Sequence, residues 1–271
     1  NFKTIGDRIG FQRGQSTTMC SWTLLETVNY FRNRGGPVYL CLLDLTKAFD
    51  HVKFSTLFRL LSTKISPILL RFVIFSYTHQ QCDVKWGNRK STSFTISNGV
   101  RQGAIASPTY FNLYINQLFD DLHASNLGCK IGDLYYGALG YADDIALLAP
   151  SRETLQKMVS ISERFFNNLG IKISTNVNIK KSKTKCIVFG LKNTPKALQL
   201  YSNKLPFVTK WKHLGHVIVD DESIRHDMDL RCNELVGKFH SLRQEFGGLD
   251  PVVMMTLVNT YLLSLYGSNL W

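Results

Sequence analysis

The stretch YGALGYADDIALLA, Tyr136–Ala149, indicates the fold of this chain most directly. Two apolar segments, Tyr136–Tyr141 and Ile145–Ala149, flank a short polar interval that contains two adjacent acids. Apolar runs on either side of a tight turn are typical of a β-hairpin. The hairpin is expected to carry Asp143 and Asp144 at its tip. By itself, an Asp-Asp pair indicates only a turn, because aspartate is a common turn former.

A third acid, Asp44, follows another apolar run. Val38–Leu43 (VYLCLL) is rich in strand formers, and a helical stretch is expected after it, from about Thr46 to Leu61. Each acid therefore lies at the end of a predicted strand, and the three could meet. Carboxylates grouped in this way hold two divalent cations about 3.5 to 4 Å apart, which suits phosphoryl transfer, and magnesium is the expected metal.

The rest of the chain predicts helices that back a sheet. Ser151 is an expected N-cap, and apolar residues recur at helical spacing from Leu155 until Gly170 ends the pattern. A glycine-containing turn and a largely apolar helix are expected between Ser97 and Leu122, and further short strands at Cys186–Phe189 and Leu214–Val219. The predicted fold class is α+β, with an antiparallel sheet backed by helices.

Composition points to a polyanionic partner. The chain has 32 Lys and Arg against 20 Asp and Glu, a formal net charge of +12. The charge favours nucleic acid without naming it, and a membrane surface or simple solubility stays open as an alternative. The six cysteines are scattered and contain no Cys-x-x-Cys pair, so they are expected to be reduced, and the pair His213 and His216 lacks the nearby cysteines of a zinc site. No apolar run approaches the length of a membrane span and no signal peptide is evident, which predicts an intracellular protein of the cytoplasm or nucleus that is not secreted.

Five ordered segments together resemble the core of reverse transcriptases, in particular those of LINE-type retrotransposons without long terminal repeats. Tyr141-Ala142-Asp143-Asp144 is similar to the YxDD box of that family. The other segments are LDLTKAFD (43–50), GVRQGAIASP (99–108) with FNLYI (111–115), KTKCIVF (183–189) and HLGHVI (213–218), and YGSNLW (266–271) resembles the start of the thumb in LINE-type elements. Each segment alone is weak, but their order and spacing match jointly.

The resemblance implies a right-hand polymerase that copies an RNA template into DNA from a DNA primer. Residues 1–36 and 51–105 would form the fingers, incomplete at the N-terminus; 37–50 and 106–219 the palm; and 220–271 the start of the thumb. It also implies two Mg²⁺ ions, for which Mn²⁺ can substitute, held by Asp44, Asp143, Asp144 and the backbone carbonyl of Leu45. The substrates would be deoxynucleoside triphosphates, and the chain is expected to be a piece of a longer protein of unknown oligomeric state.

Further roles transfer from the family residue by residue. Lys183 would protonate the leaving pyrophosphate, with Lys185 as a close alternative, and Phe49 would lie under the sugar of the nucleotide. The remaining nucleotide-binding residues would be Leu45, Thr46, Lys47, Ala48, Gln102, Gly103 and Arg13, and the template or primer would contact Pro108, Tyr141, Leu214 and Gly215.

Some positions depart from the family pattern. The family commonly has Gly-Phe-Arg in the fingers, whereas here Gly10-Phe11-Gln12-Arg13 displaces the arginine by one position, and Asn176–Lys181 resembles a small insertion. Two alternatives stay open: a decayed copy that binds nucleic acid without polymerising, and a viral RNA-dependent RNA polymerase. The second is disfavoured because Asp50 falls six residues after Asp44 rather than five and because Phe49 would crowd a ribose. Group II intron and telomerase relatives share the same core segments.

Overall fold

A four-stranded antiparallel sheet lies at the centre of the computed structural model, which describes residues 16–175 and 182–263. Its strand order is β10-β1-β9-β8. The four strands are β1 (Val38–Leu43), β8 (Ala138–Tyr141), β9 (Asp144–Ala149) and β10 (Lys185–Phe189). Every neighbouring pair in this sheet is antiparallel. The predicted α+β class and the antiparallel sheet are confirmed.

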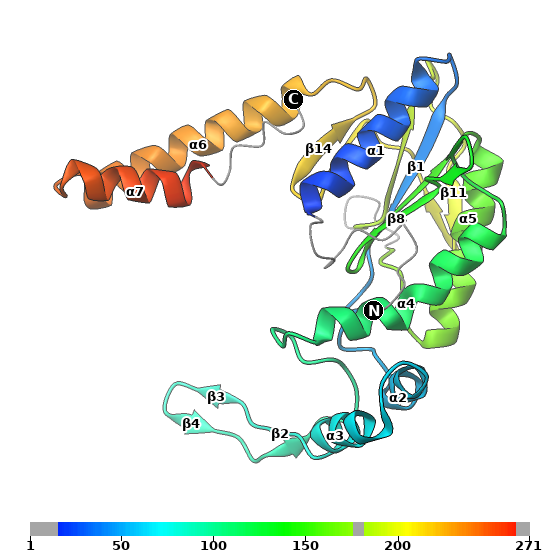
Figure 1. Ribbon diagram of the computed structural model, residues 1–271. Helices are drawn as coiled ribbons and strands as arrows, with labels where there is room; N and C mark the ends of the chain where they lie inside the picture. Colours follow the sequence, from blue (N-terminus) through cyan, green and yellow to red (C-terminus); the bar gives the residue numbers. More distant parts are fainter. Residues whose placement is uncertain (1–15, 176–181, 264–271) are drawn as a thin grey trace.

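Helices cover both faces of the sheet (Figure 1). In β1, Tyr39, Cys41 and Leu43 face one apolar core, which includes residues of α4 (Ser107–Ala124) and α5 (Arg152–Leu169). The alternate residues, Leu40 and Leu42, face a second core that includes residues of α1 (Thr17–Arg32). All six residues of β1 are buried as a result, which explains why its sequence is continuously apolar rather than alternating.

Helix α5 begins and ends where its sequence predicts. The Ser151 hydroxyl accepts a hydrogen bond from the Thr154 backbone N–H at 3.1 Å, and Gly170 ends the helix at φ +74°. The predicted hairpin is also present, with a two-residue loop, because Tyr141 pairs with Asp144. The first loop residue, Ala142, has φ +57°, as the first loop position of a type II′ turn requires.

The expected helix from Thr46 to Leu61 is wrong in its first half. Residues 46–51 form turns, and α2 spans Phe54–Ser62. Lys47 has φ +47°, which is incompatible with a right-handed helix. Two carbonyls that would accept hydrogen bonds within a helix here instead bond to a distant segment. The Val100 N–H donates to the Phe49 carbonyl, and the Gly99 N–H donates to the Val52 carbonyl. Gly99 has φ +89°, and a Cβ there would lie 3.1 Å from the Asp50 Cα, so only glycine fits comfortably.

The strand expected at Leu214–Val219 is shorter and belongs to a hairpin. Strands β13 (Lys210–His213) and β14 (His216–Val219) pair antiparallel, with His213 opposite His216. Leu214 and Gly215 form the loop, with φ +48° and +85°. Two successive left-handed residues are typical of a type I′ turn. The sequence Leu-Gly indicates such a turn less clearly than Asn-Gly would.

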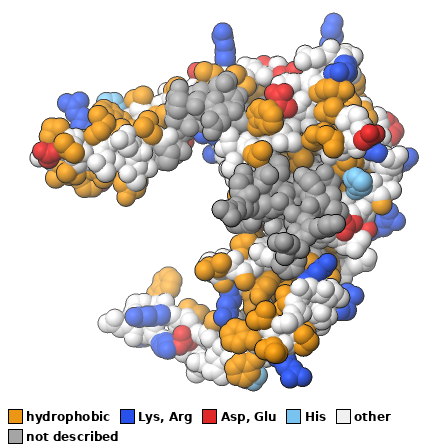
Figure 2. All heavy atoms as spheres, viewed as in Figure 1, with side chains coloured by type: hydrophobic (Ala, Val, Ile, Leu, Met, Phe, Trp, Pro, Cys, Tyr) orange, Lys and Arg blue, Asp and Glu red, His pale blue; other side chains and the backbone are white. Residues whose placement is uncertain are grey.

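Two arms extend from the central body toward the same side (Figure 1), and the space-filling view shows a hollow between them (Figure 2). One arm contains α3 (Pro67–Thr78) and a small hairpin, and the other contains α6 (Arg225–Phe246) and α7 (Pro251–Tyr261). Within the described ranges no helix is both long and apolar enough to cross a membrane. The remaining short strands are β2 (Gln81–Cys82), β3 (Lys85–Trp86), β4 (Arg89–Lys90), β5 (Phe94–Thr95), β6 (Lys130–Ile131), β7 (Leu134–Tyr135), β11 (Leu198–Leu200) and β12 (Asn203–Leu205).

Close packing between β8 and α4 generates a prediction. A methyl group at Gly140 would overlap the ring of the buried Phe119. We expect Gly140→Ala to lower the free energy of unfolding by about 1–3 kcal/mol, because overpacking forces neighbouring groups to move. Gly237→Ala is the control, since nothing lies within 4 Å of a Cβ at this helical position; it should stabilise by about 0.5–1 kcal/mol. Urea unfolding of both variants measures the difference, and an unchanged midpoint for Gly140→Ala contradicts the packing.

Candidate active site

Asp44 and Asp144 lie opposite each other at the ends of neighbouring strands. The pairing of β1 with β9 places Leu43 opposite Ile145, and the two acids occupy the next position in the same register. Cross-strand neighbours have Cβ atoms about 5 Å apart. Because side chains alternate, Asp44 lies on the same face as Leu42, and Asp144 on the same face as Ala146. The pairing of two strands therefore brings together acids that are far apart in the sequence.

Both carboxylates line a pocket of about 380 Å³. Lys183, which precedes β10, contributes a cation to the same pocket. The opposite wall comes from β13, a strand outside the central sheet. The residues that line the pocket are Leu42, Leu43, Asp44, Asp144, Lys183, Trp211, Lys212 and His213. Three strands and the segment before β10 thus enclose a pocket that contains two acids and two lysines.

The acids repel one another and are partly withdrawn from water. Burial, together with the charges of Asp143 and Asp44, raises the pKa of Asp144 to about 6, and Lys183 acts to lower it. Burial also raises the pKa of Asp44; Lys183 lowers it, Asp143 raises it, and a hydrogen bond with Ser174 lowers it. Asp143, the second residue of the hairpin loop, is therefore close enough to act on both partners. A single lysine does not compensate three neighbouring carboxylates.

The donor set fits a hard divalent cation. Among the residues that the structure describes, no three His, Cys, Asp or Glu side chains gather as closely as the ligands of a complete protein-made metal site. Mg²⁺ does not require such a site, because it is often held by one or two carboxylates together with water and substrate phosphates. Asp44 and Asp144 supply such a pair, and a cation between them would offset the burial and the repulsion that raise their pKa values.

The two candidate lysines have different surroundings. Lys183 is exposed, lines the pocket and acts on the pKa of both Asp44 and Asp144. Lys185 is buried, and its ammonium lies 4.8 Å from the centre of the Trp211 ring. Burial lowers the pKa of Lys185. Lys183 is therefore the lysine that faces the acids.

The segment after β1 is only partly open to a nucleotide. Thr46 and Lys47 are exposed, whereas Leu45 and Ala48 are buried. The Thr46 N–H already donates to the Lys172 carbonyl at 2.9 Å, so this amide is occupied by the protein itself. Phe49 is half-buried and stacks on Phe111, with ring centres 4.6 Å apart.

The other predicted site residues are not among those that line the pocket, and some lie outside the described part. Gln102 is exposed and donates to Asp50 at 3.2 Å, and Gly103 has φ +83° with open space where a Cβ would be. Pro108 lies in the first turn of α4, and Tyr141 ends β8 and packs against the core below α1. Leu214 and Gly215 form the β13–β14 loop. Arg13, Asn176–Lys181 and the segment 266–271 lie outside the described residues.

Sequence reasoning missed several residues that shape the pocket. Trp211, Lys212 and His213 form its second wall, although a strand was expected only at the neighbouring residues 214–219. The alternation Lys-Trp-Lys-His was the available signal for a half-buried strand. Ser174 was also missed; its backbone N–H donates to the Asp44 carbonyl at 2.7 Å.

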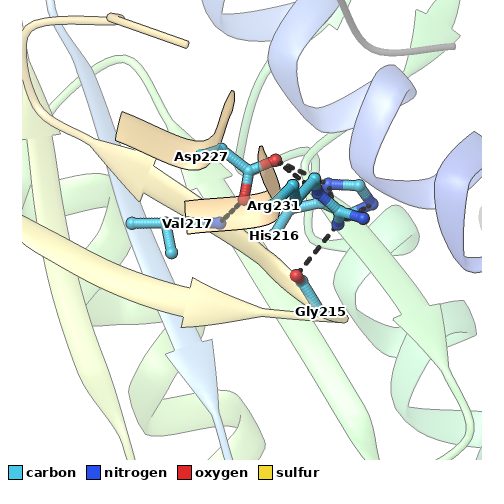
Figure 3. A network of polar contacts seen from close by, with 5 residues as sticks. All are labelled: Gly215, His216, Val217, Asp227 and Arg231. Carbon is cyan, nitrogen blue, oxygen red and sulfur yellow. Dashed lines mark hydrogen bonds and ion pairs between the residues drawn. The ribbon is translucent and has the colours of Figure 1, made fainter. Parts of the chain in front are cut away.

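A buried ionic network joins the β13–β14 loop to α6 (Figure 3). Asp227 accepts hydrogen bonds from the Val217 N–H at 2.8 Å and from Arg231 Nε at 2.9 Å, and Arg231 also donates to the Gly215 carbonyl at 3.0 Å. His216 Nδ1 lies 2.8 Å from Arg231 Nη2 and 3.2 Å from Asp227. Arginine only donates, so a neutral His216 accepts there. Burial lowers the pKa of His216, which agrees with this neutral form.

The fold is of the right-hand polymerase class. Residues 6–218 match the family described as reverse transcriptase (RNA-dependent DNA polymerase), and the chain belongs to that family. Its fold is similar to that of apo telomerase from Candida tropicalis, with a TM-score of 0.52 and 15% identity over 79% of this chain and 39% of that one.

Relatives in sequence are retrotransposon polyproteins. A Pol polyprotein of a type-2 retrotransposable element from Drosophila melanogaster is 27% identical over 74% of this chain and 19% of its own length. One from a type-1 element of Nasonia vitripennis is 29% identical over 66% of this chain and 18% of its own length. The chain thus spans about a fifth of the length of these relatives.

Asp144 and Asp227 lie in opposite electrostatic environments, so replacing each by asparagine should change the free energy of unfolding in opposite directions. In magnesium-free buffer at pH 8, Asp144→Asn should stabilise the fold by on the order of 1 kcal/mol, because it removes a repelled, partly buried charge; screening by water keeps the gain small. Because the folded pKa of about 6 lies above the usual carboxyl value of about 4, the wild-type penalty builds up between about pH 4 and pH 6 and stays constant above that, so the gain should vanish near pH 4.

Asp227→Asn is the counterpart. Although burial acts to raise the pKa of Asp227, hydrogen bonds from Val217 and Arg231 lower it overall, so its stabilising contribution is present at neutral pH and is lost as the carboxyl protonates in acid. We expect a loss of about 2–4 kcal/mol at pH 8, because the partly buried Arg231 guanidinium loses its carboxylate partner. Urea unfolding from pH 4 to 8 measures both variants. A pH-independent effect of Asp144→Asn contradicts the electrostatic interpretation.

Proposed function

We propose that this chain is the core of an RNA-templated DNA polymerase that adds deoxynucleotides to the 3′-hydroxyl of a primer, in the service of retrotransposition. The observation that carries the proposal is the pairing of Asp44 with Asp144 across β1 and β9, in a pocket with Lys183, in a chain of the reverse transcriptase family. The partners would be an RNA template, a DNA primer and deoxynucleoside triphosphates. The net charge of +12 supports a polyanionic partner.

The acids would hold two Mg²⁺ ions, or Mn²⁺ in their place. Asp44 and Asp143 would bind both ions, with Asp144 and the Leu45 carbonyl as further ligands. When bound, such ions activate the attacking hydroxyl and stabilise the charge of the leaving pyrophosphate. The role of this chain is to hold the carboxylates ionised and converging on one pocket, which the neighbouring Lys183 favours.

Lys183 would donate a proton to the leaving pyrophosphate. Its exposed ammonium lies in the pocket with the acids, whereas Lys185 is enclosed beside Trp211. Phe49 would lie beneath the sugar and exclude a 2′-hydroxyl; its stacking on the buried Phe111 would hold the ring rigidly in place. Arg13, Gln102 and Gly103 would complete the nucleotide site.

The division into lobes follows the same proposal. Residues 37–50 and 106–219, which contain the central sheet, would form the palm, and residues 51–105 the fingers together with 1–36. Helix α1, within that last segment, packs on the sheet through Cys20, Leu24 and Val28 and would thus join fingers to palm. Residues 220–271, with α6 and α7, would begin the thumb, which the Asp227 network ties to the β13–β14 loop. That loop, with Leu214 and Gly215, would contact the primer, and Pro108 and Tyr141 the template or primer.

Loss of Asp44 or Asp143, the two acids proposed to bind both ions, tests the proposal directly. Asp44→Asn and Asp143→Asn should each lower the rate of DNA primer extension on an RNA template by at least about 100-fold, because the metals lose a ligand, while affinity for the duplex changes little. Asp133→Asn, an exposed acid in the β6–β7 turn, is the control. Extension that persists in chelator contradicts the metal mechanism. Binding without any extension by the wild-type chain favours the decayed, non-enzymatic alternative.

The lysines provide a matched pair. Lys183→Ala should lower turnover by about 100-fold or more, because the leaving group loses its proton donor. The loss should shrink with a better leaving group, whereas Lys185→Ala should lower the free energy of unfolding and leave this dependence on leaving group unchanged. Single-turnover extension with nucleotides of differing leaving groups separates the two roles. Equal effects of both variants contradict the assignment of Lys183.

Phe49 predicts the choice of sugar. Phe49→Val should raise ribonucleotide incorporation relative to deoxynucleotide by about 10-fold or more, because the clash with the 2′-hydroxyl is removed. Values of kcat/KM for a matched pair of nucleotides, with a melting curve, provide the measurement. If Phe49 is simply a core residue that packs on Phe111, stability falls and the ratio stays constant, which overturns the assignment and reopens the RNA-polymerase alternative.

A further inference from the structure

A thin hairpin, residues 81–95, projects from the arm that contains α3 (Figure 1). Its base is the β2–β5 pair and its outer part the β3–β4 pair, in which Lys85 lies opposite Lys90 and Trp86 opposite Arg89. Gly87 and Asn88 form the loop, with Gly87 at φ +58°. Two short strands cannot enclose a core of their own. Its side chains are therefore available to a partner.

The hairpin exposes large apolar side chains. Trp86 is 85% exposed, compared with 49% for Trp22 on α1. Val84 is more than half exposed, and Phe94 is half exposed. A tryptophan left in water forgoes the burial that its large ring normally gains. An exposed ring at the end of a projecting hairpin is thus positioned to contact something outside the fold.

The charge around Trp86 indicates the nature of that partner. Residues 81–95 contain three cations, Lys85, Arg89 and Lys90, and a single acid, Asp83, which forms an ion pair with Lys90. Lys85 precedes Trp86 and Arg89 lies across the strand from it, and both are exposed. Figure 2 shows Lys and Arg side chains beside apolar ones on this arm. An aromatic ring between cations suits nucleic acid, whose bases stack and whose phosphates are anionic.

The base of the hairpin is fixed to the loop of the candidate nucleotide site. Arg101 Nε donates to Gln80 at 2.7 Å, and its Nη2 donates to the Ser76 carbonyl at 2.5 Å. The next residues in the chain are Gln102 and Gly103. A strand held by the hairpin would therefore lie at a defined position relative to the proposed nucleotide pocket.

We propose that the hairpin binds single-stranded nucleic acid, with Trp86 stacked on a base and Arg89, its cross-strand partner on the same face, on a flanking phosphate. Inside a duplex both faces of each base are covered by its neighbours, so the site favours unpaired bases over duplex. The inference rests on the proposed function in one respect: in that reaction the strand is the unpaired RNA template entering the pocket. The arm with α6 and α7 lies across the opening from the hairpin (Figure 1).

Equilibrium binding of the full chain to two substrates tests the proposal. One is a blunt RNA–DNA duplex, and the other is the same duplex with a single-stranded RNA extension of the template ahead of the primer terminus. Trp86→Ala should weaken binding of the extended substrate by about 10-fold and leave the blunt duplex unchanged. Trp86→Phe should retain most of the affinity, and Trp22→Ala, an exposed tryptophan on α1, should change neither. A DNA extension should give the same result, because stacking does not read the 2′-hydroxyl.

Two results overturn the inference. The first is an equal effect of Trp86→Ala on both substrates, including no effect on either. The second is a change in the sedimentation of the nucleic-acid-free protein on Trp86→Ala, which would indicate that Trp86 contacts another protein chain instead. The assay needs no nucleotide incorporation. If Trp86 is needed to bind the single-stranded overhang but the chain does not lengthen primers, only the proposed function is contradicted. If the chain lengthens primers normally but Trp86 is not needed to bind the overhang, only this inference is contradicted.

Discussion

The antiparallel pairing of β1 with β9 is the constraint on which the rest of the site depends. Their register, with Leu43 opposite Ile145, places Asp44 and Asp144 at the same level and on the same face. A slip by one residue would move every side chain of β9 to the other face, so the apolar residues that belong to one core would enter the other. Burial of both faces of β1 therefore fixes the position of the acids as firmly as it fixes the core.

Acids held in this way destabilise the chain that holds them. Burial and mutual repulsion raise the pKa values of Asp44 and Asp144, so the site is favourable only with cations nearby. The network of Asp227 and Arg231 is the opposite case, because hydrogen bonds outweigh burial and the carboxylate is stabilised. Functional sites commonly lower the free energy of unfolding, and the rest of the fold offsets that loss. Here the two apolar cores on either side of the sheet provide the offsetting stability.

Sequence predicted the parts of the fold that local signals determine. The strand Val38–Leu43, the hairpin around Asp143 and the capped helix α5 follow from apolar runs, turn residues and caps. The helix expected from Thr46 failed because residues 99–100 take the carbonyls that it needed, a contact between distant segments. For the same reason no local pattern showed that Trp211 and His213 line the acid pocket. Which lysine faces the acids was likewise decided by burial, not by spacing.

The most direct measurement of the central claim is Mn²⁺ binding to the protein with a primer–template duplex, followed by electron paramagnetic resonance. If strand pairing assembles one metal site from Asp44 and Asp144, Asp44→Asn and Asp144→Asn should each weaken Mn²⁺ binding by at least about 10-fold. Asp133→Asn should not change it. Unchanged Mn²⁺ affinity in both site variants, with folding intact, would contradict the claim that these two strand ends form one site.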